Sequence, residues 1–317
     1  MIHDSQTPAS PRSLHALAVL TVLFTLPLLF LGAGVTSHDV GMVDARGFRP
    51  PWNIVKGLFE NNGLGWRLEY GHRTFGFLVG MCGIALAVGC WFFDRRPWMG
   101  WIGVLALTMI CIQGALGIFR VDYNALHGRD FAMIHGAFAQ LVFAVLVSVA
   151  FLTSRRWATE QGETIGLGLK RWSLITAALV FGQLVLGGLV RHQQSLLGPR
   201  GHLLGAFVVV AAVVWLLKLI RESDANESFK VQRIVLMALL TLQLVLGIES
   251  WLAKYYVAQA DLPQLLPVPM HAEWIRTLHY LVGTLIFATT VVTALIAHRQ
   301  PAPESTPART RELEGAL

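Results

Sequence analysis

The sequence predicts an all-α integral membrane protein, an eight-helix bundle made of two pseudo-symmetric four-helix halves. Of its 317 residues, 54% are hydrophobic and only 14% are charged, whereas a soluble domain carries about 25% charged residues. The hydrophobic residues gather in eight runs of about 20 residues, the length that a membrane-spanning helix needs. Backbone groups in lipid must find their hydrogen-bond partners within the protein, so runs of this length are expected to be helices.

The eight runs follow one another along the chain. They are Leu14–Gly34, Tyr70–Phe93, Trp98–Phe119, Phe131–Leu152, Trp172–Val190, Gly201–Ile220, Ile234–Trp251 and Trp274–Ala297. The first run is long for a signal-peptide core and has no obvious cleavage site, so we interpret it as a retained helix.

Polar segments divide the chain into its expected parts. A linker at 154–170, expected to be cytoplasmic, separates an N-terminal half at 14–153 from a C-terminal half at 171–298. The polar, Pro-rich composition of 1–13 predicts a cytoplasmic tail, and that of 299–317 predicts a disordered tail.

The net charge of +6 indicates membrane orientation rather than nucleic-acid binding. Outside the long first loop, Lys and Arg gather in the segments that a cytoplasmic N-terminus would leave inside the cell. There is no Arg-rich transit peptide at the N-terminus. We therefore expect a multi-pass protein of the bacterial plasma membrane with both termini in the cytoplasm.

A repeated element supports an internal duplication. A Gln-x-x-x-Gly element lies near the outer end of odd-numbered runs, as Gln113–Gly117, Gln183–Gly187 and Gln243–Gly247, with a degenerate copy at Leu28–Gly32. Each even-numbered run has a histidine near its outer start: His72, His135, His202 and His279. Duplication of one four-helix unit explains both patterns.

The four histidines are candidate iron ligands, because ionisable residues inside membrane spans are costly and usually functional. A small residue follows each histidine by four positions, on the same helix face: Gly76, Ala139, Ala206 and Gly283. A porphyrin ligated through its iron would lie flat against these positions. The pattern suits two heme groups, each held by two imidazoles, and the simplest pairing joins His72 to His135 and His202 to His279.

Zinc fits the sequence less well than heme iron. Zinc sites prefer Cys and His at close spacing, and no such pair stands in these runs. The three cysteines, Cys82, Cys90 and Cys111, all lie within apolar runs, where free cysteine usually behaves as a small buried hydrophobe.

Charged residues at the outer helix ends are candidates for contacts with heme. Arginine suits bidentate carboxylate binding, so the flanking arginines are candidate ligands of heme propionates, foremost Arg73 and Arg191. The other members of this set are Arg120, Arg129, Arg200 and Arg276. Each has the alternative of a solvated charge at a helix end.

Glu69 breaks the symmetry between the halves. It stands three residues before His72, whereas the other histidines have Ala132, Pro199 and Arg276 at that position. A carboxylate beside one heme site suggests that this site performs chemistry, by relaying protons or stabilising positive charge. The alternative is a carboxylate that stabilises a helix N-terminus. A second candidate acid within a run is Glu249, whose role stays open.

On these residues the chain resembles the heme A synthase family, in the branch that lacks a cysteine pair in the first extracytoplasmic loop. The resemblance is carried by Glu69-Tyr-Gly-His72-Arg-Thr-Phe-Gly76, by Val40-Gly-Met-Val-Asp44, by Gly187-Gly-Leu-Val-Arg191-His192 and by the remaining histidines. It implies an iron enzyme of cytochrome oxidase assembly that converts heme O to heme A, oxidising a porphyrin methyl group to formyl with heme b as bound cofactor.

The resemblance also implies roles for individual residues and partners. His72 and His135 would hold the substrate heme with Glu69 as the catalytic acid, and His202 and His279 would hold heme b. The partners would be heme O, the farnesyltransferase that produces it, membrane lipid and an electron donor. The sequence leaves the donor and any homo-oligomer open.

Other readings use the same residues. A di-heme b-type electron-transfer protein needs the histidines but no role for Glu69, and a heme carrier needs one weak pair. A transporter would favour helices broken by Gly and Pro near the membrane centre, and Pro27 is the clear case here. The loop 38–68 is expected to cover the substrate heme with Trp52, Phe59 and Trp66.

Overall fold

The computed structural model describes residues 10–60, 63–159, 163–193, 196–253 and 270–299. Within these ranges the chain forms helices and loops, with no strand. In the described part of the chain, eight helices are long and apolar enough to cross a membrane. The predicted all-α membrane fold is therefore confirmed. The predictions for residues 1–9 and 300–317 fall outside the described part of the chain.

The eight long helices cover the eight predicted runs and extend most of them. They are α1 (Arg12–Ser37), α3 (Leu64–Phe92), α4 (Pro97–Asp122), α5 (Asn124–Leu152), α7 (Leu167–His192), α8 (Leu197–Arg221), α9 (Lys230–Trp251) and α10 (Met270–Ala297). Three short elements lie between them: α2 (Pro51–Gly57), α6 (Arg155–Thr159) and the 3-10 turn η1 (Asn226–Phe229).

Several boundaries differ from the sequence-based expectation. Helix α1 begins at Arg12, within the predicted tail, and α7 begins at Leu167, within the predicted linker. Helix α5 begins at Asn124, seven residues before the apolar run, and is kinked at His127, whose φ of −138° and ψ of 21° are not helical. Polar first turns do not show in hydropathy, because they lie beyond the apolar core of each span.

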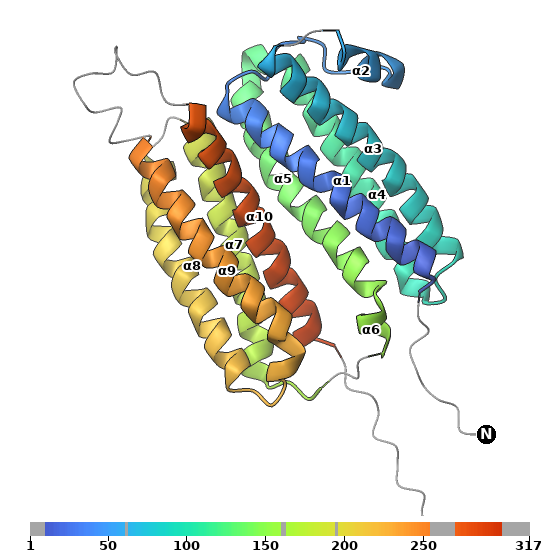
Figure 1. Cartoon of the computed structure of the whole chain (residues 1–317), viewed down its shortest axis with the longest axis vertical. Coiled ribbons are helices and arrows are strands. Elements are labelled where there is room, and N and C mark those ends of the chain that lie inside the picture. Colours follow the sequence, from blue (N-terminus) through green and yellow to red (C-terminus); the bar gives the residue numbers. More distant parts are fainter. Residues whose placement is uncertain (1–9, 61–62, 160–162, 194–195, 254–269, 300–317) are drawn as a thin grey trace, which may run out of the picture.

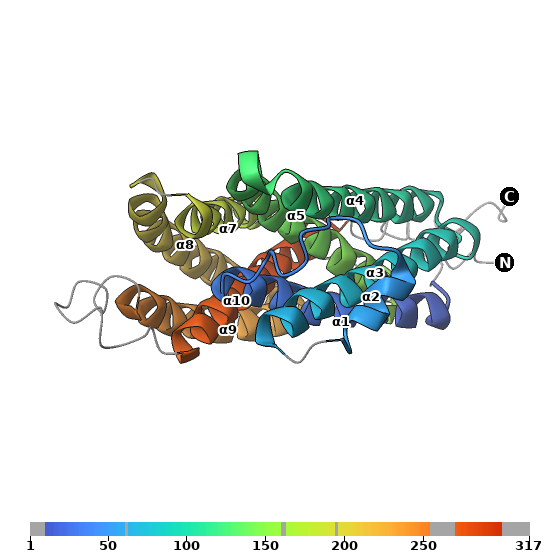
Figure 2. The ribbon, with the colours of Figure 1, turned by 90° about the horizontal axis from the view of Figure 1, so that it is seen from above.

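The long helices form two groups of four that lie side by side (Figure 1). Helices α1, α3, α4 and α5 pack together, as do α7, α8, α9 and α10. The groups meet where α1 and α5 contact α10 and where α5 contacts α7, and the view from above shows α10 next to α1 and α5 (Figure 2). This grouping is consistent with the two predicted four-helix halves, while their pseudo-symmetry and their origin by duplication stay predictions.

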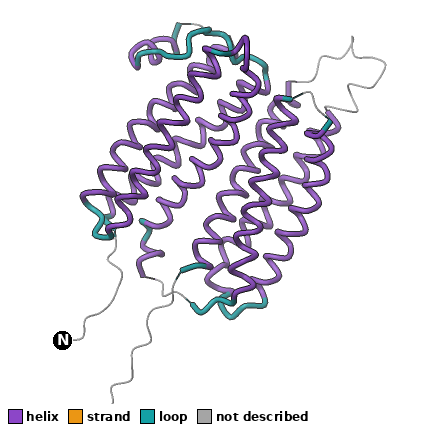
Figure 3. The backbone as a smooth tube through the Cα atoms, turned by 180° about the vertical axis from the view of Figure 1, so that it is seen from behind, coloured by secondary structure: helices purple, strands orange, loops and turns teal. Residues whose placement is uncertain are grey.

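Connections lie at both ends of the bundle, and α2 covers one end of the first group (Figures 1 and 3). We call this the α2 end. Helices α1, α4, α7 and α9 finish there, and α3, α5, α8 and α10 start there. The even number of spans brings the start of α1 and the end of α10 to the opposite end.

Each half has its own apolar core. Leu86, Met99 and Val149 are fully buried in the first half, and Val213 and Leu236 are fully buried in the second. A third cluster, containing Leu29, Phe143 and Ala288, joins α1, α5 and α10 across the boundary between the halves. This contact fixes the relative position of the two cores.

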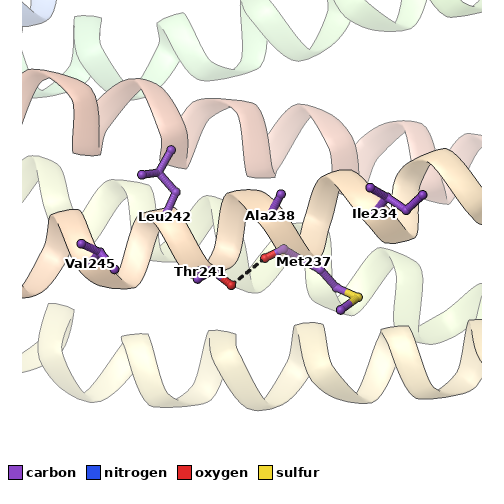
Figure 4. Close-up of a pocket in the computed structure, with 6 residues that line it drawn as sticks. All are labelled: Ile234, Met237, Ala238, Thr241, Leu242 and Val245. Atoms are coloured by element: carbon purple, nitrogen blue, oxygen red, sulfur yellow. Dashed lines mark hydrogen bonds between the residues drawn. The ribbon is translucent and has the colours of Figure 1, made fainter.

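Large apolar side chains also cover the outside of the bundle, as expected where lipid is the solvent. Figure 4 shows one such region, a groove of about 610 Å³ along α9 that includes Ile234, Met237 and Val245. The hydroxyl of Thr241 in this groove donates to the Met237 carbonyl at 3.0 Å. The groove therefore presents an apolar surface, because the Thr241 hydroxyl is bonded to the backbone of its own helix.

The loop between α1 and α3 lies against the first turns of α3. Trp66 stacks on Tyr70 with ring centroids 4.5 Å apart, and its Nε1 donates to the Gly57 carbonyl at 2.5 Å. Trp52 is 72% exposed and Phe59 is 80% exposed. Both side chains are exposed in this structure, and the expectation that Trp52 and Phe59 contact a bound heme stays a prediction.

Candidate functional site

The first pair of candidate ligands meets inside the first half. His72 lies in the third turn of α3, and His135 lies on α5 beyond the kink. Their ring centroids are 6.3 Å apart, with 74° between the ring planes. Helices α3 and α5 both start at the α2 end and run in the same direction, which brings these side chains to the same level, although 63 positions separate them in the sequence.

The second pair meets in the same way inside the second half. His202 on α8 and His279 on α10 have ring centroids 6.1 Å apart and an interplanar angle of 80°. A metal held at about 2 Å from one nitrogen of each of two imidazoles puts the ring centroids on the order of 6 Å apart. The ring separation in both pairs is therefore compatible with two imidazoles that would hold one metal between them.

Each histidine ring packs against a glycine of a neighbouring helix. A Cβ atom would lie 2.7 Å from His72 at Gly32, 3.1 Å from His135 at Gly117, 3.2 Å from His202 at Gly187 and 3.1 Å from His279 at Gly247. These are the four glycines of the repeated element seen in the sequence. Their common role is to leave room for an imidazole.

The small residues one turn after the histidines behave differently in the two halves. Gly76, after His72, has only Leu28 nearby, with a Cβ clearance of 3.8 Å. Gly283, after His279, is crowded by Leu184 at 3.1 Å and by Gln243 at 3.2 Å. The expected clearance for a flat ring is therefore present beside His72 and reduced beside His279.

A hydrogen bond fixes the tautomer of His72. Its Nδ1 lies 2.9 Å from the Leu28 carbonyl oxygen, and a carbonyl can only accept, so Nδ1 carries the proton. Nε2 is left with a lone pair that can bind a metal, and a second partner on the other nitrogen is what usually orients a metal-binding histidine.

The glutamines of the repeated element contact the other three histidines. The amide nitrogen of Gln113 lies 3.2 Å from both ring nitrogens of His135, and that of Gln243 lies 3.3 Å from Nε2 of His279. The Gln183 amide donates to the His202 backbone carbonyl at 2.8 Å. Leu28 replaces the glutamine in α1, where its backbone carbonyl contacts the ring instead.

Several buried polar atoms around these pairs have no hydrogen-bond partner. They are Nδ1 of His202 and of His279, and the side-chain oxygens of Gln113, Gln183 and Gln243. In the described residues, no cluster of three or more His, Cys, Asp or Glu side chains could hold a bare metal ion. Paired imidazoles with few other donors fit a heme, whose porphyrin supplies the remaining iron ligands.

Glu69 is buried, with 5% of its surface exposed. One carboxylate oxygen accepts from the Arg73 guanidinium at 2.6 Å, and the other accepts from the Val43 backbone N–H at 2.9 Å. Glu69 therefore joins the first turns of α3 to the loop, one turn from His72.

Asp44 forms a second connection between loop and helix. Its carboxylate accepts from the Tyr70 hydroxyl at 2.7 Å and from Nε of Arg49 at 2.6 Å. Burial raises the pKa of Asp44, but the hydrogen bonds from Tyr70, Arg49 and the Arg46 backbone outweigh burial and hold this pKa below its usual value of 3.8.

Arg73 completes the connection. Its guanidinium donates to the Arg46 carbonyl at 2.9 Å and to the Asp44 carbonyl at 3.2 Å, besides its bond to Glu69. Glu69, Arg73, Asp44 and Tyr70 form what we call the loop clamp. The role of Arg73 in binding propionate stays a prediction, and in this structure its nitrogens bind the protein itself.

Arg191 lies between the two halves. It donates from α7 to the Ala33 carbonyl and the Ser37 hydroxyl of α1, both at 2.9 Å, and its guanidinium lies 5.3 Å from the ring centre of Tyr280 on α10. Tyr280 follows His279 directly, and its hydroxyl accepts from Gln140 at 2.5 Å. Neither Gln140 nor Tyr280 was among the residues predicted from the sequence. The signal for Gln140 was an amide in the middle of an apolar run.

Other contacts join the halves at the α2 end. Nδ1 of His38 lies 2.5 Å from a carboxylate oxygen of Glu273, and the Thr277 hydroxyl donates to Ser37 at 2.9 Å. Glu249, the other acid considered from the sequence, is exposed on α9. It lies outside this set of polar contacts.

A comparison with protein-family models gives the family. The model described as cytochrome oxidase assembly protein, COX15-CtaA, matches residues 2–147 and, in an overlapping match, residues 60–198. Together the matches cover more than half of the 317 residues.

The chain belongs to the COX15-CtaA family of cytochrome oxidase assembly proteins. This result confirms the resemblance to heme A synthases and connects the chain with heme A synthesis for cytochrome oxidase. The matched residues include Glu69, His72, His135 and Arg191, and they end before His202 and His279. No curated protein matches the sequence.

Proposed function

We propose that this chain is a heme A synthase, a membrane oxidoreductase that converts heme O to heme A by oxidising one porphyrin methyl group to formyl. The observation that carries the proposal is the pair of His–His contacts, with ring separations of 6.3 Å and 6.1 Å, one in each half. Two sites that each contain a pair of histidines suit a cofactor and a substrate that are both hemes.

The difference between the halves supports the assignment of substrate and cofactor. The loop clamp and the open Gly76 stand beside His72 and His135, so we assign heme O to this pair. We assign heme b to His202 and His279, where it would supply one-electron redox chemistry. The α3 residues of the first site are covered by the loop, which limits the access of water to them.

Glu69 has a defined role in this proposal. Arg73 and the Val43 N–H hold its carboxylate in one position, and a carboxylate fixed in this way can stabilise positive charge or accept a proton without reorganising. The hydrogen bond from Nδ1 to the Leu28 carbonyl orients the His72 ring, so its Nε2 points away from this carbonyl of α1. Both residues are preorganised by neighbours on α1 and the loop.

The proposal includes the setting of the protein. We place it in the bacterial plasma membrane with the α2 end outside and both termini in the cytoplasm, in line with its basic residues. Its partners are heme O, the farnesyltransferase that makes heme O and a donor of electrons. The overall oxidation would use O₂, and heme b held by His202 and His279 would supply electron transfer to the first site.

A di-heme electron-transfer protein is the second candidate. It is favoured by the contacts of Glu69, whose two oxygens are both occupied, one by the Val43 backbone N–H and one by the Arg73 guanidinium. In that case Glu69 would act only in structure, and the two iron sites would exchange electrons without changing either porphyrin.

Heme extraction from cells tests the two candidates. The chain is expressed in an aerated host that makes heme O, lacks heme A and provides a competent electron donor, and the extracted hemes are identified by chromatography and mass. The synthase predicts a new formyl heme that is absent from the His72→Ala and Glu69→Ala variants and present in Glu249→Ala, a control acid outside the site. Heme O that stays unconverted beside bound heme b would refute the synthase and leave the electron-transfer protein.

A further inference from the structure

A polar cavity of about 480 Å³ lies between the two halves at the α2 end. Its walls come from the end of α1 and the following loop, from the junction of α4 and α5, and from the end of α7. The ionisable side chains in its lining are Arg120, Arg129, Arg191, His192 and Asp39. Three guanidinium groups facing one carboxylate make this a site for an anion.

Two of these arginines are available to a ligand. Within the described residues, neither Arg120 nor Arg129 has a hydrogen bond or an ion pair, although Arg120 packs against the backbone at Gly41. Arg191 is already bonded to Ala33 and Ser37 and forms a fixed wall. The charges of Glu69 and Asp39 act on Arg120 without a hydrogen bond or ion pair to it. A guanidinium enclosed by protein is stabilised by an opposite charge within hydrogen-bond reach, so Arg120 can still bind an anionic partner.

The position of the cavity relates it to both histidine pairs. Arg120 comes three residues after Gly117, which packs on His135, and Arg191 comes four residues after Gly187, which packs on His202. Ala132, another lining residue, precedes His135 by three positions. At 1.5 Å rise per residue these offsets amount to about 5 Å along the helix axes. The cavity therefore lies one helical turn beyond the histidines, toward the α2 end.

We propose that this cavity binds the two propionate carboxylates of the porphyrin held by His72 and His135, with Arg120 as the principal ligand and Arg129 at the entrance. The ligand class follows from the proposed function, on which this inference rests. A carboxylate pairs with arginine through two parallel N–H···O bonds, and the offset of one turn allows one molecule to reach iron ligands and guanidinium together. Arg73, which the sequence suggested for this task, instead holds the loop clamp.

Binding of heme with and without free carboxylates tests the assignment. The full chain carrying His279→Ala, so that the second pair lacks one ligand, is purified in detergent and titrated with heme b and with heme b dimethyl ester, and the Soret absorbance is followed. Arg120→Gln should weaken binding of the free acid by about 10-fold or more and leave the affinity for the ester unchanged. Arg120→Lys should keep part of the preference for the free acid.

Arg95→Gln is the matched control, because Arg95 is an exposed arginine between α3 and α4, at the opposite end of the bundle. It removes the same charge and should leave both affinities as in the parent. Equal weakening of acid and ester in Arg120→Gln, or no weakening of the acid, would overturn the propionate site.

The titration separates this inference from the proposed function, because it involves no turnover. A preference for the free acid that depends on Arg120, in a chain that leaves heme O unconverted, would support the cavity and refute the synthase. Conversion of heme O by a chain whose Arg120→Gln variant binds acid and ester as the parent does would support the synthase and refute the propionate site. A chain that binds neither heme at His72 and His135 would refute both.

Discussion

The imidazole of His72 packs directly against Gly32, so that a Cβ atom at position 32 would lie 2.7 Å from Cε1 and 2.8 Å from Nδ1 of the ring. The same ring donates to the carbonyl of Leu28, one turn earlier on α1. Helix α1 thus supports the imidazole through one residue and orients it through another. The other three histidines rest on Gly117, Gly187 and Gly247 in the same way.

Replacing Gly32 should displace the ligand without changing the ligand itself. In Gly32→Ala the added methyl group forces His72 away from Leu28, and we expect affinity for heme at the first pair to fall about 10–100-fold, as for other residues that orient metal ligands. Soret titration measures this. Gly80→Ala on α3 is the control, because nothing lies within 4 Å of a Cβ there. Unchanged heme affinity in Gly32→Ala would contradict this account.

Charge-removing substitutions should show different roles for Glu69 and Arg73. If Glu69 serves only to hold the loop, Glu69→Gln and Arg73→Gln break the same contact and should lower conversion of heme O to the same degree. The proposed catalytic role predicts instead that Glu69→Gln lowers kcat about 100-fold or more, while Arg73→Gln acts mainly on KM. Steady-state kinetics with extracted hemes decides between them, and a matching loss of kcat in both variants would remove Glu69 from the chemistry.

The loop clamp should weaken in acid. Asp44 has a pKa below 3.8 in the folded protein, so its charged form is favoured by folding. Its contribution is fully present above the unfolded value and is lost as the pH falls through the folded value. We expect hydrogen exchange in residues 39–60 to accelerate below about pH 4, relative to the middle of α5. In Asp44→Asn this pH dependence should disappear, and its persistence there would assign it to another group.

Arg96 should matter for stability rather than for heme. It is 4% exposed and bonds Asp94 at 2.7 Å, the Ser10 hydroxyl at 2.5 Å and the Leu152 carbonyl at 2.9 Å. Removing one partner of a buried ion pair costs about 3–5 kcal/mol, so Arg96→Ala should lower the unfolding free energy by that amount in a denaturant titration in detergent. The exposed neighbour, in Arg95→Ala, should cost less than about 0.5 kcal/mol. Similar losses of unfolding free energy in both variants would mean that the buried ion pair stabilises the fold no more than an exposed arginine does.

The sequence by itself determined the number and type of the elements and the identity of the candidate ligands. Lipid cannot satisfy backbone hydrogen bonds, so each long apolar run was expected to form a helix. The length of each run in the sequence indicated the length of its helix. The recurrence of His72, His135, His202 and His279 at one level of the membrane was visible for the same reason. Helix periodicity then placed Glu69 on the face of His72.

Only the tertiary structure decided which side chains meet. The pairing of His72 with His135, the contact of His72 with Gly32 and the position of Arg191 between the halves each join residues at least 40 positions apart. Such contacts depend on how the helices are rotated and packed, and packing between helices leaves little trace in hydropathy because lipid is as apolar as the core. Arginines that were equivalent candidates in the sequence therefore have different environments in the structure. Arg73 binds the loop, Arg191 lies between the halves and Arg120 faces a cavity.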